Sequence, residues 1–170
     1  MKKLIFMLIA SFVVFSCGIS KNFKNDDLTT INPSFKADYW AYSSPIDSCK
    51  NTDQILRMFR LNDPNVDNVS ISFDMNNDFR MKYKNFLGGN SYKTFKGKFK
   101  KNYYEIYLEK NRKSIPLIYN KTTIERIRIR IMKDSTLIVE KYYNHSGYIL
   151  LMAAGNSSKT YFKFKKIKNL

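Results

Sequence analysis

The sequence predicts a mainly β protein built as an antiparallel meander of about eight or nine strands. Apolar and polar residues alternate strictly along several short segments, and turn sequences separate these segments. No long helical pattern lies between them, and the connections are too short for parallel crossovers. Such a meander closes into a barrel or folds into a sandwich, and closure removes exposed sheet edges. The pattern therefore favours a lipocalin-like up-and-down barrel, with a β-sandwich as the alternative.

The first 16 residues have the composition of a secretory signal peptide. Lys2 and Lys3 precede an apolar run at 4–15, which ends at the small residue Ser16. The run is shorter than the roughly 20 residues that a membrane-spanning helix needs. A transmembrane anchor and a plain cleaved signal are the two alternatives to a lipoprotein signal.

The run Val14-Phe15-Ser16-Cys17 resembles the lipobox of bacterial lipoproteins. The resemblance implies that the Cys17 thiol receives a diacylglyceryl group, that the chain is cut before Cys17, and that the new amino terminus is acylated, palmitate being the expected acyl group. Two or more such chains anchor a protein lastingly, because each buried methylene contributes about 0.8 kcal/mol. We therefore expect a lipid-anchored protein of the cell envelope, in the outer membrane and facing the periplasm.

Removal of the signal peptide leaves 154 of the 170 residues, which suits one domain. We predict a signal peptide at 1–16, a lipidated Cys17 with a flexible polar tether through residue 36, and a β domain at 37–170. Cys49 would then be the only other thiol, so the sequence predicts no internal disulfide. We expect Cys49 to be structural or incidental.

Basic residues dominate the composition. The net charge of +16 becomes +14 when Lys2 and Lys3 are removed. Such a balance is typical of proteins that bind nucleic acid or anionic membranes. Because an exported and tethered protein rarely meets nucleic acid, we expect no nucleic acid partner. Compositional bias towards lysine, and attraction to anionic lipid or glycan, remain as explanations.

The elements follow from the pattern in chain order. Residues 39–42 form an aromatic patch, and 53–61 fit either a short helix or a strand. Gly97 lies inside an alternating segment and predicts a bulge or sharp bend. The clearest alternating segments are 69–73, 79–83, 95–99, 104–108, 126–131, 137–142 and 161–165.

Five further segments are interpreted from composition. Residues 111–114 are predicted to be a loop, and 115–119, which contain Pro116, an edge or irregular strand. Residues 142–147 and 155–158 are predicted to be turns. The apolar run 148–154 is predicted to be a strand that is covered on both faces.

Three of these segments carry a second resemblance. Ile115-Pro116-Leu117-Ile118-Tyr119, the segment at 124–129, and Leu137-Ile138-Val139 resemble a family of uncharacterised bacterial lipoproteins, over roughly residues 55–162. This resemblance implies no activity. The similarity to lipocalins is one of strand pattern alone.

The sequence contains no recognisable catalytic constellation. With His145 as the only histidine, a zinc site lacks ligands. The spacing of Asp74, Asn76 and Asp78 lacks the glycine and distal glutamate of a calcium loop. We therefore predict no metal, no cofactor and no enzymatic activity, and we expect His145 to be a solvated turn residue.

Glu125 and Trp40 are the candidate cavity residues. Glu125 shares the strand face of the neighbouring isoleucines, so a buried Glu125 would indicate a ligand site; Trp40 is a second candidate for lining a cavity. Glu105 and Glu109 are predicted to share one strand face that points to solvent.

Arg126, Arg128 and Arg130 form the most distinctive polar feature, a ladder on one strand face. Their charges repel one another unless acids, aromatic rings or a bound anion lie opposite, and Glu140 is the expected acidic partner. The ladder is interpreted either as a solvated outer face or as a strip that binds an anion or a partner protein.

Three functions fit these observations. The first is a non-enzymatic lipoprotein that binds an apolar or amphipathic ligand in its barrel or acts as a scaffold. The second is a protein–protein interaction module, such as an inhibitor, immunity or envelope-assembly factor. The third is a periplasmic hydrolase. A filled interior would favour the second.

Overall fold

The computed structural model describes residues 27–44, 53–116, 118–150 and 152–167, which form two antiparallel sheets and one short helix. This confirms the predicted mainly β, antiparallel fold. The signal peptide, Cys17 and Cys49 lie outside the described residues.

The smaller sheet has four strands in the order β2-β3-β4-β5. Buried and exposed side chains alternate strictly along β4, as its sequence predicts. Residues 55–58 form the helix α2, which settles the choice left open for residues 53–61. The bounds are β2 (Lys36–Trp40), α2 (Ile55–Met58), β3 (Asn68–Phe73), β4 (Phe79–Lys84) and β5 (Asn90–Phe95).

The larger sheet runs in the order β10-β9-β8-β7-β6, and the two-residue strand β1 pairs with β8. Because β1 belongs to this sheet, residues 28–29 are part of the fold and not of the tether expected through residue 36. Four of the strands are 13 or 14 residues long. The bounds are β1 (Leu28–Thr29), β6 (Gly97–Lys100), β7 (Tyr103–Ile115), β8 (Tyr119–Met132), β9 (Leu137–Ile149) and β10 (Met152–Phe164).

Gly97 marks the corner where the chain leaves the smaller sheet and enters the larger one. A Cβ atom at this position would lie 2.5 Å from Cε1 of Tyr104 and 2.6 Å from the carbonyl oxygen of Glu105, so only glycine fits. The sharp bend predicted at Gly97 is confirmed.

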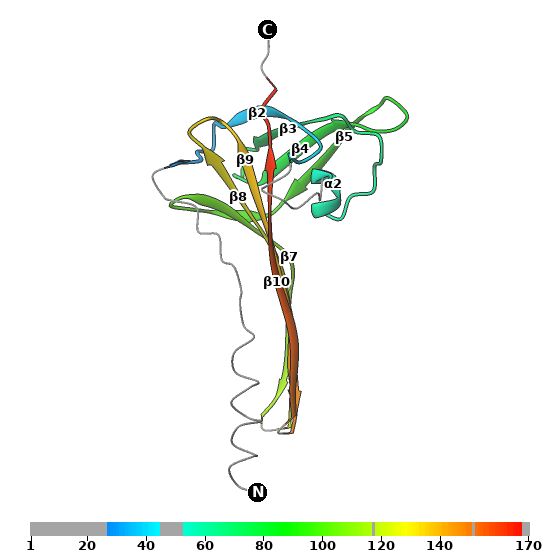
Figure 1. Ribbon diagram of the computed structural model, residues 1–170, viewed down its shortest axis with the longest axis vertical. Coiled ribbons are helices and arrows are strands. Elements are labelled where there is room, and N and C mark those ends of the chain that lie inside the picture. The colour runs from blue at the N-terminus through cyan, green and yellow to red at the C-terminus, as the bar shows by residue number, and fades with distance from the viewer. Residues whose placement is uncertain (1–26, 45–52, 117, 151, 168–170) are drawn as a thin grey trace, which may run out of the picture.

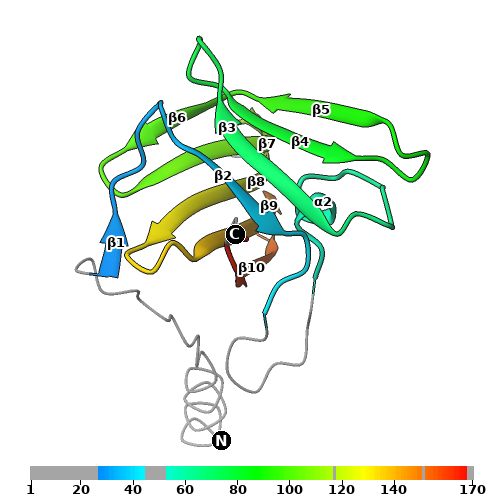
Figure 2. The same cartoon turned by 90° about the horizontal axis from the view of Figure 1, so that it is seen from above.

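The predicted closed barrel is wrong, because the strand ladders of the described residues form two separate sheets. The chain changes sheets at the Gly97 corner. Among the described residues, the opposite edges meet through isolated bridges at Tyr39–Lys166 and Ser44–Lys163. In Figure 2 the smaller sheet lies across the larger one. The arrangement is nearer to the sandwich alternative.

Aromatic side chains fill the space between the two sheets. Tyr39, Phe79 and Tyr104 are fully buried, and Tyr104 of β7 packs against rings from the smaller sheet. Ring centroids in this cluster are 4.7 to 6.4 Å apart, which is the range of favourable aromatic pairs. The cluster comprises Phe59, Phe73, Phe79, Phe95, Phe99 and Tyr104.

The four long strands continue past this core as a narrow arm, which projects from the rest of the molecule in Figure 1. The arm is defined here as residues 110–115, 119–124, 144–149 and 152–157 with the turns between them. Its strands stay in continuous register, from the row that contains Lys110 and Ile124 to the row that contains Ile115 and Tyr119. Six residues per strand give the arm a length of about 20 Å.

The arm overturns five of the sequence-based interpretations. Residues 111–114 lie in β7, 142–147 in β9 and 155–158 in β10, so none of them is a loop or turn. The apolar run 148–154 is no covered strand: it spans a hairpin turn at the tip of the arm, with Ile149, Leu150 and Met152 exposed. Residues 115–119 likewise span the other tip turn. Apolar composition predicted burial here, whereas the residues face outwards.

Candidate functional site

Glu125 lies at the root of the arm, where the apolar row of β8 ends. Its side chain shares the buried face of Ile127 and Ile129, as its position predicts, and the residue is only 5% exposed. Arg60 Nε donates a hydrogen bond of 3.1 Å to Glu125 Oε2, and Lys141 Nζ lies 3.1 Å from Oε1. Two cations therefore hold the carboxylate, which accounts for its burial without a ligand.

Glu109 faces Glu125 across the strand pair because a β-bulge between Tyr107 and Glu109 shifts the register. The prediction that Glu105 and Glu109 share one face is therefore wrong. Like charges directly opposite each other destabilise a sheet. The Arg60 guanidinium relieves this repulsion because it contacts both carboxylates, with 2.9 Å from its terminal nitrogen to Glu109 Oε2. Arg60, Glu109, Glu125 and Lys141 are called the root cluster below.

The root cluster shifts the ionisation of Glu125. Burial acts to raise the pKa of this carboxyl, but hydrogen bonds from Arg60 and Lys141 and their positive charges outweigh burial. The pKa of Glu125 is therefore held below its ordinary value of 4.5.

The arginine ladder lies on the opposite face of β8, and acids and aromatic rings surround it. Arg128 Nε donates a hydrogen bond of 2.8 Å to Glu105 Oε2, and Arg130 donates one of 2.8 Å to Glu140. The guanidinium of Arg126 lies 4.8 Å from the ring centre of Tyr142. Burial acts to lower the pKa of Arg128, but the hydrogen bond from its guanidinium to Glu105 and nearby negative charge raise it.

Glu140 is the expected partner of the ladder, and the structure confirms this contact. The residue is 1% exposed, and nitrogens of all three ladder arginines and of Lys159 lie within 2.8 to 3.8 Å of its carboxylate. The ladder side chains are themselves only 13% to 22% exposed, so they are no solvated face. Because their charges pair internally, the ladder is better suited to holding the long strands together than to binding an external anion.

Trp40, the second candidate for lining a cavity, and His145, expected to be a solvated turn residue, both lie apart from these clusters. Trp40 is 51% exposed at the end of β2, so it does not line an interior cavity. His145 is exposed in the middle of β9 and not in a turn. Its Nδ1 shares a hydrogen bond of 3.3 Å with Thr123 Oγ1, and its ring stacks on Tyr143.

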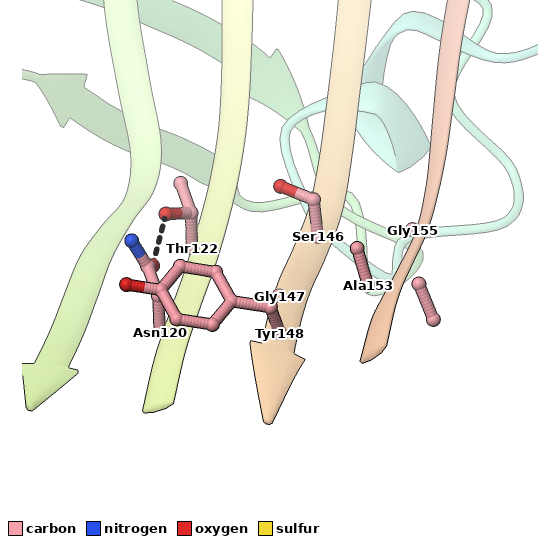
Figure 3. Close-up of a pocket in the computed structure, with 8 residues that line it drawn as sticks. Asn120, Thr122, Ser146, Gly147, Tyr148, Ala153 and Gly155 are labelled. Atoms are coloured by element: carbon pink, nitrogen blue, oxygen red, sulfur yellow. Dashed lines mark hydrogen bonds between the residues drawn. The ribbon is translucent and has the colours of Figure 1, made fainter. Parts of the chain in front are cut away.

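Sequence reasoning missed the hollows on the arm. A shallow groove of about 420 Å³ lies over Gly155, and Figure 3 shows Asn120, Thr122, Ser146 and Tyr148 around it. A larger and mainly apolar groove of about 680 Å³ lies beside the tip, over Gly147. A Cβ atom at Gly147 would lie 2.5 Å from the carbonyl oxygen of Asn120. The two glycines, isolated within β-strand sequence, were the signal that could have indicated these hollows.

A third cleft, of about 520 Å³, lies at the Gly97 corner. Four lysines and one carboxylate line it, which makes this end of the domain strongly basic. Its charged lining residues are Lys96, Lys98, Lys100, Lys110 and Glu105.

Comparisons with known proteins add no assignment: no family model, no curated protein sequence and no solved structure matches this chain. Within the described ranges, no group of three or more His, Cys, Asp or Glu side chains is placed to hold a metal ion. No helix of the described part is long and apolar enough to span a membrane.

We predict that replacement of Glu125 by Gln lowers the free energy of unfolding at pH 7 by about 1–2 kcal/mol, because both cations lose their charged partner. Since the pKa of Glu125 is lowered by folding, its contribution is present above pH 4.5 and is lost as the pH falls through the folded-state pKa. Urea unfolding of both proteins between pH 7 and pH 3 should show their difference shrinking with acid.

Glu109→Gln is the matched control, because Glu109 contacts the same arginine but is exposed. Its effect should stay below about 0.5 kcal/mol at either pH. A difference between Glu125→Gln and the natural sequence that is constant with pH would contradict the proposed ionisation.

Proposed function

We propose that this chain is a non-enzymatic, membrane-anchored lipoprotein of the cell envelope that binds a protein partner along the free edge of its arm. The lipobox-like sequence at Cys17 supports the anchor, and the absence of acidic residues directly behind it supports a periplasm-facing position. The edge of β10 is the observation that carries the binding role.

The β10 strand is the last strand of its sheet. Backbone groups of the smaller sheet's end contact its outer edge only near the C-terminal end of β10, within the described residues. Trp40 and Ser44 donate backbone hydrogen bonds to the carbonyls of Lys165 and Lys163, at 3.1 and 2.8 Å. No described strand pairs with the outer edge of residues 152–158. The backbone N–H and C=O groups of this edge are therefore available to pair with an added strand of a partner protein.

The sequence of this edge differs from that of a protected one. Charged residues, proline or bulges usually protect natural sheet edges from pairing with strands of other chains. On the arm's other edge, β7 carries Lys110, Arg112 and Lys113. By contrast, residues 152–158 carry no charge and no proline, and β10 pairs with β9 without a register shift. This favours strand addition at β10 over β7.

The packed interior favours this function over a ligand-binding barrel. The rings of Phe73, Phe79 and Tyr104 fill the space between the sheets, where a barrel ligand would have to lie. A hydrolase receives no support either, because arginines hold Glu105 and Glu140 in ion pairs. The partner is therefore expected to be a protein that offers an extended segment.

The edge can be tested at Ser157. The carbonyl of Lys163 points outwards, and alternate residues of a strand direct their backbone groups to the same side, so Ser157 N–H also points outwards. In Ser157→Pro this donor is lost while the ladder to β9 is kept. We expect a photo-crosslinker at Asn156 to give a discrete adduct in envelope membranes, which Ser157→Pro abolishes and Ser157→Ala retains.

A crosslinker at Met75, which is fully exposed in a turn of the domain, controls for nonspecific capture. The same adduct from Met75, or an adduct from Asn156 that survives Ser157→Pro, would refute strand addition at this edge.

The anchor requires its own test at Cys17. Cys17→Ser removes the thiol that would receive the diacylglyceryl group, so we expect an unprocessed and unacylated precursor. Metabolic labelling with a tagged fatty acid measures this directly, with Cys49→Ser as the control that keeps its label. Normal labelling of the Cys17→Ser protein would rule out lipidation at this cysteine.

A further inference from the structure

The tip of the arm is an exposed apolar cap. The N–H of Leu150 donates a hydrogen bond of 2.6 Å to the carbonyl of Ile118, so the two turns form a single surface. Five apolar residues among the described part of this surface are more than half exposed to solvent. The tip cap consists of Ile115 (54%), Ile118 (52%), Ile149 (61%), Leu150 (63%) and Met152 (82%).

Leu150 shows that folding alone does not account for this cap. Its backbone has a φ of 54°, in the left-handed region that glycine and asparagine adopt far more readily than leucine. Its side chain also gains little burial in the folded chain. Neither backbone conformation nor packing explains a leucine here, whereas contact with an apolar environment does.

Basic residues lie on β7 and β8 of the arm, behind the cap. The arm carries Lys110, Arg112, Lys113 and Lys121, and its described residues include no Asp or Glu. Lys113 and Lys121 lie directly opposite each other in the β7–β8 ladder, where their like charges repel. This pair therefore favours an anion between or beside the two side chains.

The distance along the strands between the Lys113–Lys121 pair and the tip cap matches the depth to which proteins insert at a membrane interface. The Lys113–Lys121 pair lies two residues from the Ile115–Tyr119 pair, which corresponds to about 7 Å along the strands. Interfacial protein segments bury their apolar face about 5–10 Å into the headgroup and acyl boundary. With the cap at that depth, the lysines lie at the level of the lipid phosphates.

We propose that the tip cap docks into an anionic lipid bilayer surface, with Lys113 and Lys121 binding lipid phosphates. The cap is a projecting surface, and cations alone accompany it, so it suits a fluid anionic surface better than a protein pocket of fixed shape. This contact depends neither on lipidation of Cys17 nor on strand addition at β10. It sets the arm upright on the membrane, and the β10 edge then stands between bilayer and domain.

Tryptophan fluorescence of the full chain in vesicles tests this contact. Trp40 is the only tryptophan and lies on the domain, so the natural chain reports the domain's position. An Ile118→Trp, Trp40→Phe chain reports the tip instead. With brominated lipids containing about 30 mol% phosphatidylglycerol, we expect at least two-fold quenching at position 118 and little at Trp40.

Two variants in the Ile118→Trp background separate binding from folding. Leu150→Asn removes an apolar side chain but relieves the backbone, so quenching should fall at least two-fold while the urea midpoint of unfolding stays equal or rises. Lys113→Gln with Lys121→Gln should lower quenching in phosphatidylglycerol vesicles to the level seen in phosphatidylcholine alone. Lys84→Gln with Lys93→Gln makes the same charge change on the smaller sheet and should leave quenching unchanged.

The outcomes are distinct. A tip tryptophan that stays unquenched in vesicles to which the chain is bound overturns the proposal, and so does quenching that Leu150→Asn does not reduce. Equal quenching with and without phosphatidylglycerol overturns the role of the two lysines. Because Trp40 of the natural chain and the unfolding midpoint of each variant serve as controls, failure of the Cys17 anchor would not imitate either result.

Discussion

The structure depends on the ion pairs that hold Glu125 at the root of the arm. The same face of β8 that supplies Ile127, Ile129 and Ile131 to the core continues into the arm, where nothing comparable covers it. On this face Glu125 is the next residue after Ile127, and Arg60, which follows α2, forms a hydrogen bond with it. This contact closes the end of the core and fixes the direction in which the long strands leave it.

The arm must be stable without a core of its own. Its two outer strands are exposed along their length, and only Thr123 of its inner strands is buried. Its stability therefore comes from the backbone ladder, cross-strand pairs and continuity with the domain. On the other face of β8, the layer formed by Glu140 and the three arginines ties β7, β8 and β9 together just before they diverge from the core. Ion pairs therefore stabilise both faces of β8 near the point where the apolar core ends.

Local alternation predicted the strands of the domain well, because one face of each is buried and the other is wet. Val69, Ile71 and Met81 are buried as their parity requires, and Gly97 forms the predicted bend. Closure of the sheet was not predictable in this way, because it depends on how distant edges meet. The bulge that moves Glu109 to the face of Glu125 leaves no clear mark in the alternation either.

The strands and tip turns of the arm were not predicted from the sequence, for a different physical reason. An apolar run such as 148–154 normally indicates burial, since exposed apolar surface is unfavourable in water. Here the same composition lies in and beside an exposed turn, so the rule fails at the tip of the arm. The polar residues at 155–158 and 111–114 resemble loops for the complementary reason, because both faces of the arm are wet. The pairing of Arg60 with Glu125 joins residues 65 positions apart and depends on tertiary structure.

Strand addition at β10 and docking of the tip cap both require the arm to be a preformed and rigid extension of the domain. Amide hydrogen exchange of the full chain, resolved by peptide mass, measures this most directly for the two inner strands. We predict that amides at 119–124 and 144–149 exchange at least about 100-fold more slowly than in an unstructured peptide, because both strands are paired on each side. Exchange in these segments at the rate of an unfolded chain would show that the arm is not preformed.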